Sequence, residues 1–257
     1  MDMTIDDVSG VRGEIPRVGT AGWGLPRQWR SRFPDEGSHL ERYATRFNAV
    51  EINSSFYRQH RRAVYERWAA SVPPDFRFAV KLPRAITHDQ RLVASDVLLD
   101  VFLDEACGLG GRMGPLLVQL PPSLAFDLEH VDEFFTTLRE RHGGTVACEP
   151  RHESWFAPLA EEVLRRHAIA RVAADPARVP AAAAPGGDDR LVYFRLHGSP
   201  RIYYSDYEPE RLSPIATALR GANARGADAW CILDNTTLGA ATGNALWLME
   251  SLVTTAR

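Results

Sequence analysis

The sequence has little lysine, little cysteine and no long apolar run. Of its 30 lysine and arginine residues, only Lys81 is a lysine. Arginine carries a rigid, forked and permanently charged guanidinium, whereas lysine carries a mobile point charge. The shortage of lysine therefore favours forked contacts to carboxylates or phosphates over loosely held surface charges.

The three cysteines, Cys107, Cys148 and Cys231, are odd in number and widely spaced. No CxxC pair or Cys/His ligand spacing occurs, so neither a disulfide framework nor a structural zinc site is predicted. The acidic start, MDMTIDDVSG, does not resemble a signal peptide, and no apolar run approaches the ~20 residues that span a bilayer. We expect a cytoplasmic protein without a membrane segment.

The composition is that of a soluble globular chain. Hydrophobic residues make up 45% and charged residues 25% of the 257 residues, and this length can bury a large core. The formal net charge of −3 supplies no basic field for nucleic acid, so a nucleic-acid partner would need a local basic patch.

Eight short apolar or β-branched runs alternate with helical patterns. The strand-like runs cover residues 17–23, 49–53, 76–83, 115–120, 145–148, 171–175, 191–198 and 229–235. The helical patterns cover residues 38–47, 64–72, 96–109, 128–142, 158–167, 214–225 and 244–252. Eight βα units in about 250 residues predict an α/β fold of the (β/α)8 TIM-barrel type.

An open doubly wound sheet is the competing fold. It is disfavoured because GTAGWG, at residues 19–24, is a weak dinucleotide fingerprint with no helix opening on it. Residues 1–14 are predicted to be a disordered lead and residues 15–257 a single barrel domain. The broken segment near residues 181–187 predicts a shortened crossover between the sixth and seventh strands.

Polar residues gather where the predicted strands end. In GTVACEPRHESW, at residues 144–155, a buried strand stops in titratable groups. Side chains two apart on a strand share a face, which pairs Glu51 with Asn53, Glu149 with Arg151, and Arg195 with His197. Lys81 and Gln119 take the same place on the third and fourth strands. We interpret this face as a barrel mouth, because a purely structural network of buried charges would be costly.

Seven ordered motifs resemble those of the YecE-like family, domain of unknown function 72. They are GTAGW, VEINSSFY, FAVKLP with TH after it, LLVQLPPS, CEPRHESW, YFRLHG and DNTTLGAATGNA, and together they run from about residue 17 to 248. The resemblance implies a TIM-type barrel and no settled activity. Two departures stand out, Asp234 in place of an aromatic or apolar residue and the shortened segment at 181–187.

The residues themselves predict a hydrolytic or acid–base enzyme acting on an anionic, phosphorylated or nucleotide-like substrate. Glu51 and Glu149 are the candidate acid/base carboxylates, and His197 and His88 the candidate proton-transfer groups. The candidate substrate-binding residues are Lys81, Arg151 and Arg195 for the anion, Asn53, Gln119 and Asn235 for orientation, and Trp23, Trp155 and Tyr203 for stacking.

Two other functions compete with this prediction. Paired carboxylates across a barrel suit a glycosidase or sugar isomerase, although the surrounding cations would depress the pKa of a general acid. A binding barrel without catalysis is the other. No cofactor is predicted. A divalent metal is an open alternative, with Glu51, Glu149, Asp175, His88, His152 and His197 as its candidate ligands.

Overall fold

The computed structural model of the protein describes residues 15–254, so the predicted lead at residues 1–14 lies outside the described chain. The strands are β1 (Arg17–Thr20), β2 (Ala49–Ile52), β3 (Arg77–Lys81), β4 (Met113–Gln119), β5 (Val146–Glu149), β6 (Ile169–Arg171), β7 (Ala173–Asp175), β8 (Gly186–Gly187), β9 (Leu191–Leu196) and β10 (Asp228–Leu233). The α-helices are α1 (His39–Ala44), α2 (Arg62–Ala70), α3 (Asp96–Ala106), α4 (Leu128–Arg141), α5 (Pro158–Arg166), α6 (Pro209–Ala224) and α7 (Ala240–Thr254).

Shorter helical turns fill several strand-to-helix connections. They are η1 (Arg27–Arg32), η2 (Ser54–Phe56), the π-helical turn η3 (Ala85–Asp89), η4 (Cys107–Arg112), η5 (Glu153–Phe156) and η6 (Pro180–Ala183). Of these, η2, η3 and η5 directly follow strands that carry predicted mouth residues. They therefore shape the same end of the sheet that the sequence singles out.

The helices begin where the local sequence supplies caps. Ser38 and Glu41 form a capping box at the start of α1, because each satisfies a backbone N–H of the other. The Asp127 side chain accepts from the backbone N–H of His130 at the start of α4. Proline occupies the first turn of α5, where a missing N–H costs nothing.

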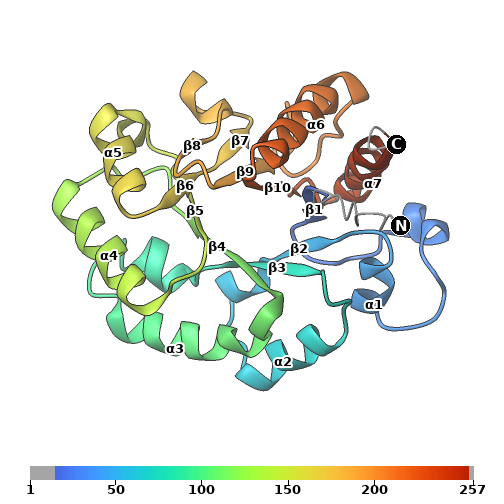
Figure 1. The fold of residues 1–257 in the computed structure, drawn as a ribbon, viewed down its shortest axis with the longest axis horizontal. Helices are drawn as coiled ribbons and strands as arrows, with labels where there is room; N and C mark the ends of the chain where they lie inside the picture. Colours follow the sequence, from blue (N-terminus) through green and yellow to red (C-terminus); the bar gives the residue numbers. More distant parts are fainter. Residues whose placement is uncertain (1–14, 255–257) are drawn as a thin grey trace, which may run out of the picture.

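The strands form two largely parallel sheets. One has the order β1-β10-β9-β7 and the other β2-β3-β4-β5-β6-β8, with only the β6–β8 pairing antiparallel. The sheets meet at a parallel bridge between Ala21 and Glu51. They also meet along one chain segment, since β6 pairs with β5 and β7, which follows at once, pairs with β9. Figure 1 shows the strands in the middle of the molecule with the α-helices around them.

Two apolar cores lie on opposite faces of the strands. The larger core packs strands against helices, while the smaller one is made of Ala49, Ala79, Leu117, Ala147, Ala170, Val172, Leu191, Tyr193, Trp230 and Ile232. Within the smaller core, the rings of Tyr193 and Trp230 stack with centroids 6.0 Å apart. Strands buried on both faces are typical of α/β folds.

The structure confirms an α/β fold and corrects two predicted boundaries. Helix α6 begins at Pro209 rather than at Pro214, which lies inside it, so the sequence pointed to the wrong one of two prolines. The sixth strand starts at Ile169 and is interrupted at Val172. Between β7 and β9 the chain forms η6 and β8 without an α-helix, as the shortened crossover predicts. No helix in residues 15–254 is both long and apolar enough to cross a membrane.

Candidate functional site

Strand alternation lifts polar side chains directly above the smaller core. Glu51, Lys81, Gln119, Glu149 and Arg195 each lie two residues beyond a member of that core, on β2, β3, β4, β5 and β9. Residues two apart on a strand point to the same face. The polar face that the sequence predicts therefore lies on the side of the smaller core, at the carboxyl ends of the strands.

Arg195 is the centre of a buried group of charges. Its guanidinium lies 2.8 Å from Glu51 Oε1, 3.0 Å from Glu149 Oε2 and 2.9 Å from Asp234 Oδ2. The Arg195 side chain is 1% exposed, and the three carboxylates are 0–7% exposed. We call Glu51, Glu149, Arg195, His197 and Asp234 the strand-end cluster.

His197 joins two carboxylates of this cluster. Its Nε2 lies 2.8 Å from Glu149 Oε1 and its Nδ1 lies 3.1 Å from Asp234 Oδ2. Burial by itself lowers the pKa of His197, but Glu149 and the two hydrogen bonds raise it above its ordinary value. His197 is therefore held as an imidazolium that donates from both nitrogens.

The Glu149 carboxylate is held in its ionised form. Burial alone would raise its pKa, but the positive charges of His197, Arg195 and Arg151 outweigh burial and hold the pKa well below its ordinary value. The pKa of Asp234 is lowered in the same way, with Arg195 as the strongest opposing charge. Both groups are thus acceptors, and neither is a neutral acid.

Glu51 is enclosed on all sides. Both of its oxygens accept from the Arg195 guanidinium, and Oε2 also accepts from the Tyr193 hydroxyl at 3.1 Å. The side chain has no exposed surface. Neither Glu51 nor Arg195 offers surface to a substrate in this structure, although the sequence predicted direct roles for both.

Lys81 lies beside the cluster but is not bonded to it. Its Nζ sits 4.0 Å from the centre of the Phe56 ring, and within residues 15–254 it makes no hydrogen bond or ion pair. The residue is 5% exposed. Nζ has no hydrogen-bond partner and is not among the fully buried unpartnered atoms of residues 15–254, so the amine keeps some exposed surface at the carboxyl end of β3. Burial and then the charge of Arg195 lower the pKa of Lys81 to about 8.

Arg151 lies at the edge of the cluster. Its Nε and Nη2 donate to Glu149 Oε1 at 3.2 and 3.0 Å, and its side chain keeps 18% exposure. Among the described residues, Nη1 has no hydrogen-bond partner. Arg151 therefore keeps unpartnered N–H donors at the carboxyl end of β5.

His88 also contacts Phe56. The two rings meet edge to face with centroids 4.9 Å apart, and Nδ1 lies 2.9 Å from the Thr87 hydroxyl. Burial, followed by the charges of Lys81, Arg84 and Arg151, lowers the pKa of His88. His88 is consequently a neutral imidazole that is influenced by the charges of Lys81 and Arg151.

The predicted stacking residues separate into two groups. Trp155 is fully buried, packs on Phe126 and donates its indole N–H to Leu124, so it belongs to the core and cannot stack on a ligand. Tyr203 is 39% exposed and meets His197 edge to face at 6.0 Å. Trp23 is half-buried against Trp68.

The predicted amides occupy the same end of the strands. Asn53 and Asn235 each keep a buried side-chain oxygen that has no hydrogen-bond partner in the described chain. The Asn235 amide nitrogen donates to Ser205 and Asn244, which ties β10 to the loop that carries Tyr203. Gln119 is 6% exposed and lies opposite Glu149 in the β4–β5 register.

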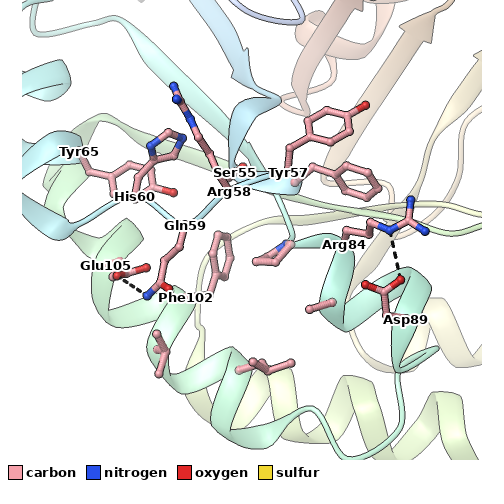
Figure 2. Close-up of a pocket in the computed structure, with 15 residues that line it drawn as sticks. Ser55, Tyr57, Arg58, Gln59, His60, Tyr65, Arg84, Asp89, Phe102 and Glu105 are labelled. Atoms are coloured by element: carbon pink, nitrogen blue, oxygen red, sulfur yellow. Dashed lines mark hydrogen bonds and ion pairs between the residues drawn. The ribbon is translucent and has the colours of Figure 1, made fainter.

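A cavity of about 340 Å³ adjoins this end of the strands (Figure 2). It lies between η2, η3 and α3, and two polar pairs, Arg84–Asp89 and Gln59–Glu105, line it. No member of the strand-end cluster lines the cavity, but Phe56 contacts both the cavity and Lys81. The ring therefore forms a boundary between them.

Sequence reasoning missed three contributors. Asp234 was treated only as a departure from the family pattern, although Trp230, Ile232 and Asp234 alternate on one face of β10 and its continuation. Tyr193 has the same parity as Arg195, which could have placed its hydroxyl near Glu51. The position of Phe56 had no periodic signal, since it lies in the turn η2.

The predicted metal ligands do not come together as a metal centre. In residues 15–254 no group of three or more His, Cys, Asp or Glu side chains is arranged to hold a metal ion. Asp175 instead accepts from the Tyr207 hydroxyl at 2.6 Å and pairs with Arg211, while His152 bonds to Ser154.

Comparison with known proteins connects this arrangement to one family. A family model described as "Protein of unknown function DUF72" matches residues 17–257. UPF0759 protein YecE of Escherichia coli K12 is 32% identical over 146 residues, 56% of this chain and 52% of the relative. The chain thus spans about half the length of the curated relatives it matches.

Solved structures agree over a longer range. A DUF72 family protein from Thermotoga maritima is 26% identical with a TM-score of 0.78, covering 93% of this chain and 100% of that one. A DUF72 family protein from Enterococcus faecalis is 20% identical with a TM-score of 0.77, covering 93% and 96%. The second likeness shows the fold alone.

The cluster should depend strongly on Arg195. We expect Arg195→Met to lower the free energy of unfolding by about 3–5 kcal/mol, because three buried carboxylates would lose their common partner. Arg190→Met is the matched control, since its pair with Asp188 involves a side chain that is 72% exposed and should cost less than about 1 kcal/mol. Urea denaturation at pH 7 measures both, and equal losses would contradict the central role of Arg195.

Removal of the Lys81 charge should raise the free energy of unfolding, the opposite of the effect expected for Arg195→Met. Since the folded pKa of about 8 lies below the unfolded value of 10.5, the unfolded state binds more protons between these pH values. The loss of stability caused by burying the Lys81 ammonium is fully present below pH 8 and disappears as the pH rises to 10.5. We expect Lys81→Met to raise the free energy of unfolding at pH 7 by about 1–3 kcal/mol, with the gain shrinking towards pH 10.

The control for this experiment is Lys81→Arg, which keeps the charge at every pH and should show no such gain. Denaturation in urea across pH 7–10 measures all three proteins. A Lys81→Met protein that is less stable than wild type at pH 7, or a gain that does not depend on pH, would show that the amine is not a buried and uncompensated charge.

Proposed function

Because this chain belongs to the DUF72 family, whose description gives no activity, we propose its function from the strand-end chemistry alone. We propose an enzyme that acts by acid–base chemistry, hydrolytic in its simplest form, on a small substrate bearing phosphate or carboxylate. A phosphorylated or nucleotide-like compound fits this description. The site is the carboxyl end of the strands, where α/β enzymes bind their ligands.

We further propose that the two sheets close into one (β/α)8 ring. Two contacts support closure. The Gly22 N–H donates to the Glu51 carbonyl at 2.9 Å, which joins the end of β1 to β2. On the other side, the run formed by β6 and β7 pairs with β5 and with β9. Such a ring would gather the strand-end cluster, Lys81 and Arg151 at one mouth.

The observation that carries the functional proposal is the imbalance of charge at this mouth. Glu51, Glu149 and Asp234 are matched by Arg195, Arg151 and protonated His197. Lys81 adds a positive charge that no described carboxylate pairs. An anion placed between the Lys81 amine and the unpartnered Nη1 of Arg151 would accept hydrogen bonds from both groups and balance the charge of Lys81.

Proton transfer is assigned to His88. Its imidazole is half-buried, and the positive charges of Lys81 and Arg151 help to lower its pKa and keep it neutral. It can therefore accept a proton from water or from the substrate. His197 is held protonated between Glu149 and Asp234, but it is buried and both of its nitrogens are bonded, so we assign it to positioning rather than to proton transfer. The Tyr203 ring meets the His197 ring edge to face.

The buried members of the cluster serve as positioning residues. Arg195 and Glu51 hold each other, and Glu149 orients both Arg151 and His197. The unpartnered oxygens of Asn53 and Asn235 are enclosed, so these two residues are also assigned to positioning rather than to direct contact with a substrate. Of the predicted anion-binding residues, we thus keep Lys81 and Arg151 and leave out Arg195. Of the predicted acid/base residues, we keep His88 and leave out Glu51.

A glycosidase is less well supported. Such an enzyme needs one protonated carboxylic acid beside the scissile bond. Glu149 is held ionised by three cations, and Glu51 is bonded to Arg195 through both oxygens. Neither carboxylate is free to donate a proton to a leaving group.

Binding of inorganic phosphate tests the proposed function. At pH 7 and low ionic strength, isothermal titration calorimetry should detect phosphate binding, and Arg151→Met and Lys81→Met should each weaken it about tenfold or more by removing a charge-assisted contact. Arg84→Met is the control, because Arg84 adjoins the mouth but is paired with Asp89. Absence of binding, or equal binding by all the variants, would contradict the proposal.

Two further variants, His88→Asn and Glu51→Gln, distinguish a hydrolase from a glycosidase. Turnover of p-nitrophenyl phosphate that falls about a hundredfold in His88→Asn would support the assigned proton transfer. Turnover of a neutral p-nitrophenyl glycoside that is lost in Glu51→Gln would instead support the glycosidase.

A further inference from the structure

We infer that Lys81 is a nucleophile, and that its amine forms an iminium with the carbonyl carbon of an aldehyde or ketone that also carries the anionic group. The identity of the anion rests on the proposed function, but the covalent step does not. Three features of the structure support it: the surroundings of Nζ, its position at the mouth and a neighbouring proton carrier.

The surroundings of Nζ favour the neutral amine. Nζ lies over the face of the Phe56 ring, 4.0 Å from its centre, and forms no ion pair with a carboxylate of residues 15–254. The ring face and the charges of Glu51, Glu149 and Asp234 favour the ammonium, but burial and the charge of Arg195 outweigh them and lower the pKa of Lys81. Every carboxylate of the strand-end cluster is already bonded to Arg195 or His197. A lysine that is desolvated next to another cation loses its proton readily and becomes a nucleophile near neutral pH.

The backbone that carries the amine is also held in place. The Ser55 hydroxyl lies 2.6 Å from the Lys81 carbonyl oxygen and 2.9 Å from that of Ile52, so it connects the ends of β2 and β3. The next residue in η2 is Phe56, whose ring therefore stays beneath the amine. A nucleophile at the end of a strand, on an apolar support, is held ready for an incoming carbon.

The covalent step balances without any oxidant or reductant. The Lys81 ammonium first gives a proton to His88 through a water molecule, and the free amine attacks the carbonyl carbon to form a carbinolamine. The C–O bond then breaks, and the oxygen leaves as water with protons from nitrogen and from His88. Ammonium and carbonyl thus yield iminium and water, with one positive charge on each side. The iminium accepts the electron pair when a bond to the adjacent carbon breaks.

The electrostatics of the mouth suit this product. Lys81 carries its charge without a carboxylate partner, so the positive iminium gains from an anionic group on the same substrate. Arg151 keeps a donor free for that group. A 2-oxo acid or a phosphorylated aldehyde has the required combination of carbonyl and anion.

The single lysine makes a direct test simple. The protein is incubated at pH 7 with glyoxylate, an anionic aldehyde, or with glycolaldehyde, a neutral one of similar size, and reduced with cyanoborohydride. Because Lys81 is the only lysine of the chain, peptide mass spectrometry has only the N-terminal amine as a second target. We expect modification of Lys81 at least about tenfold faster in the folded protein than in urea, with the rate rising through pH 8.

Two variants sharpen the test. His88→Asn should slow modification of Lys81 about tenfold or more but leave its midpoint near pH 8, because a proton carrier is lost and the surroundings of the amine are not. Arg151→Met should slow the reaction with glyoxylate and leave that with glycolaldehyde unchanged. Modification confined to the N-terminal amine, or no faster at Lys81 in the folded protein than in urea, would overturn the inference.

The outcomes separate this inference from the proposed function. Fast modification by both aldehydes, with no preference for glyoxylate, would uphold the nucleophile and contradict the anion site. Phosphate binding that depends on Lys81 and Arg151, with no modification of Lys81, would uphold the anion site and overturn the nucleophile.

Discussion

The arrangement of the site depends on the ion pairs of Arg195. One buried guanidinium holds Glu51 of β2, Glu149 of β5 and Asp234 at the end of β10, and so ties distant parts of the chain together. Such a group is tolerable in an interior only when every charge is paired and hydrogen bonded. The cluster meets this condition with His197 and Arg151 as its additional cations.

The reactivity proposed for Lys81 follows from its burial beside the positive charge of Arg195. The nearby carboxylates are bonded to Arg195 and His197, and none forms an ion pair with Lys81. Their charges still favour the Lys81 ammonium, but burial and the charge of Arg195 outweigh them. Arg195 thus affects Lys81 without contacting it. The positive charge of Arg195 lowers the pKa of Lys81, while the hydrogen bonds of Arg195 itself stay buried in the cluster. The strand-end cluster, whose charges are paired with one another, and the unpaired Lys81 amine are therefore electrostatically linked.

Much of this site could be predicted from sequence, because alternation along a strand is fixed by backbone geometry. Glu149 and Arg195 were expected to converge, and they do. Alternation does not reveal the stagger between strands, so it could not show that Arg195 would be enclosed by carboxylates. Trp155 was misplaced for a related reason, since its orientation is set by the turn η5, where the period of two ends.

The central claim is that Lys81 is a buried ammonium without a carboxylate partner, and its own titration tests this most directly. Because the chain has one lysine, incorporation of lysine labelled with ¹³C at Cε gives a single side-chain resonance to follow by NMR from pH 6 to 12. The account predicts a midpoint of about 8, and an increase in that midpoint when Arg195 is replaced by Met. A midpoint near the ordinary value of 10.5 in the wild-type protein would contradict it.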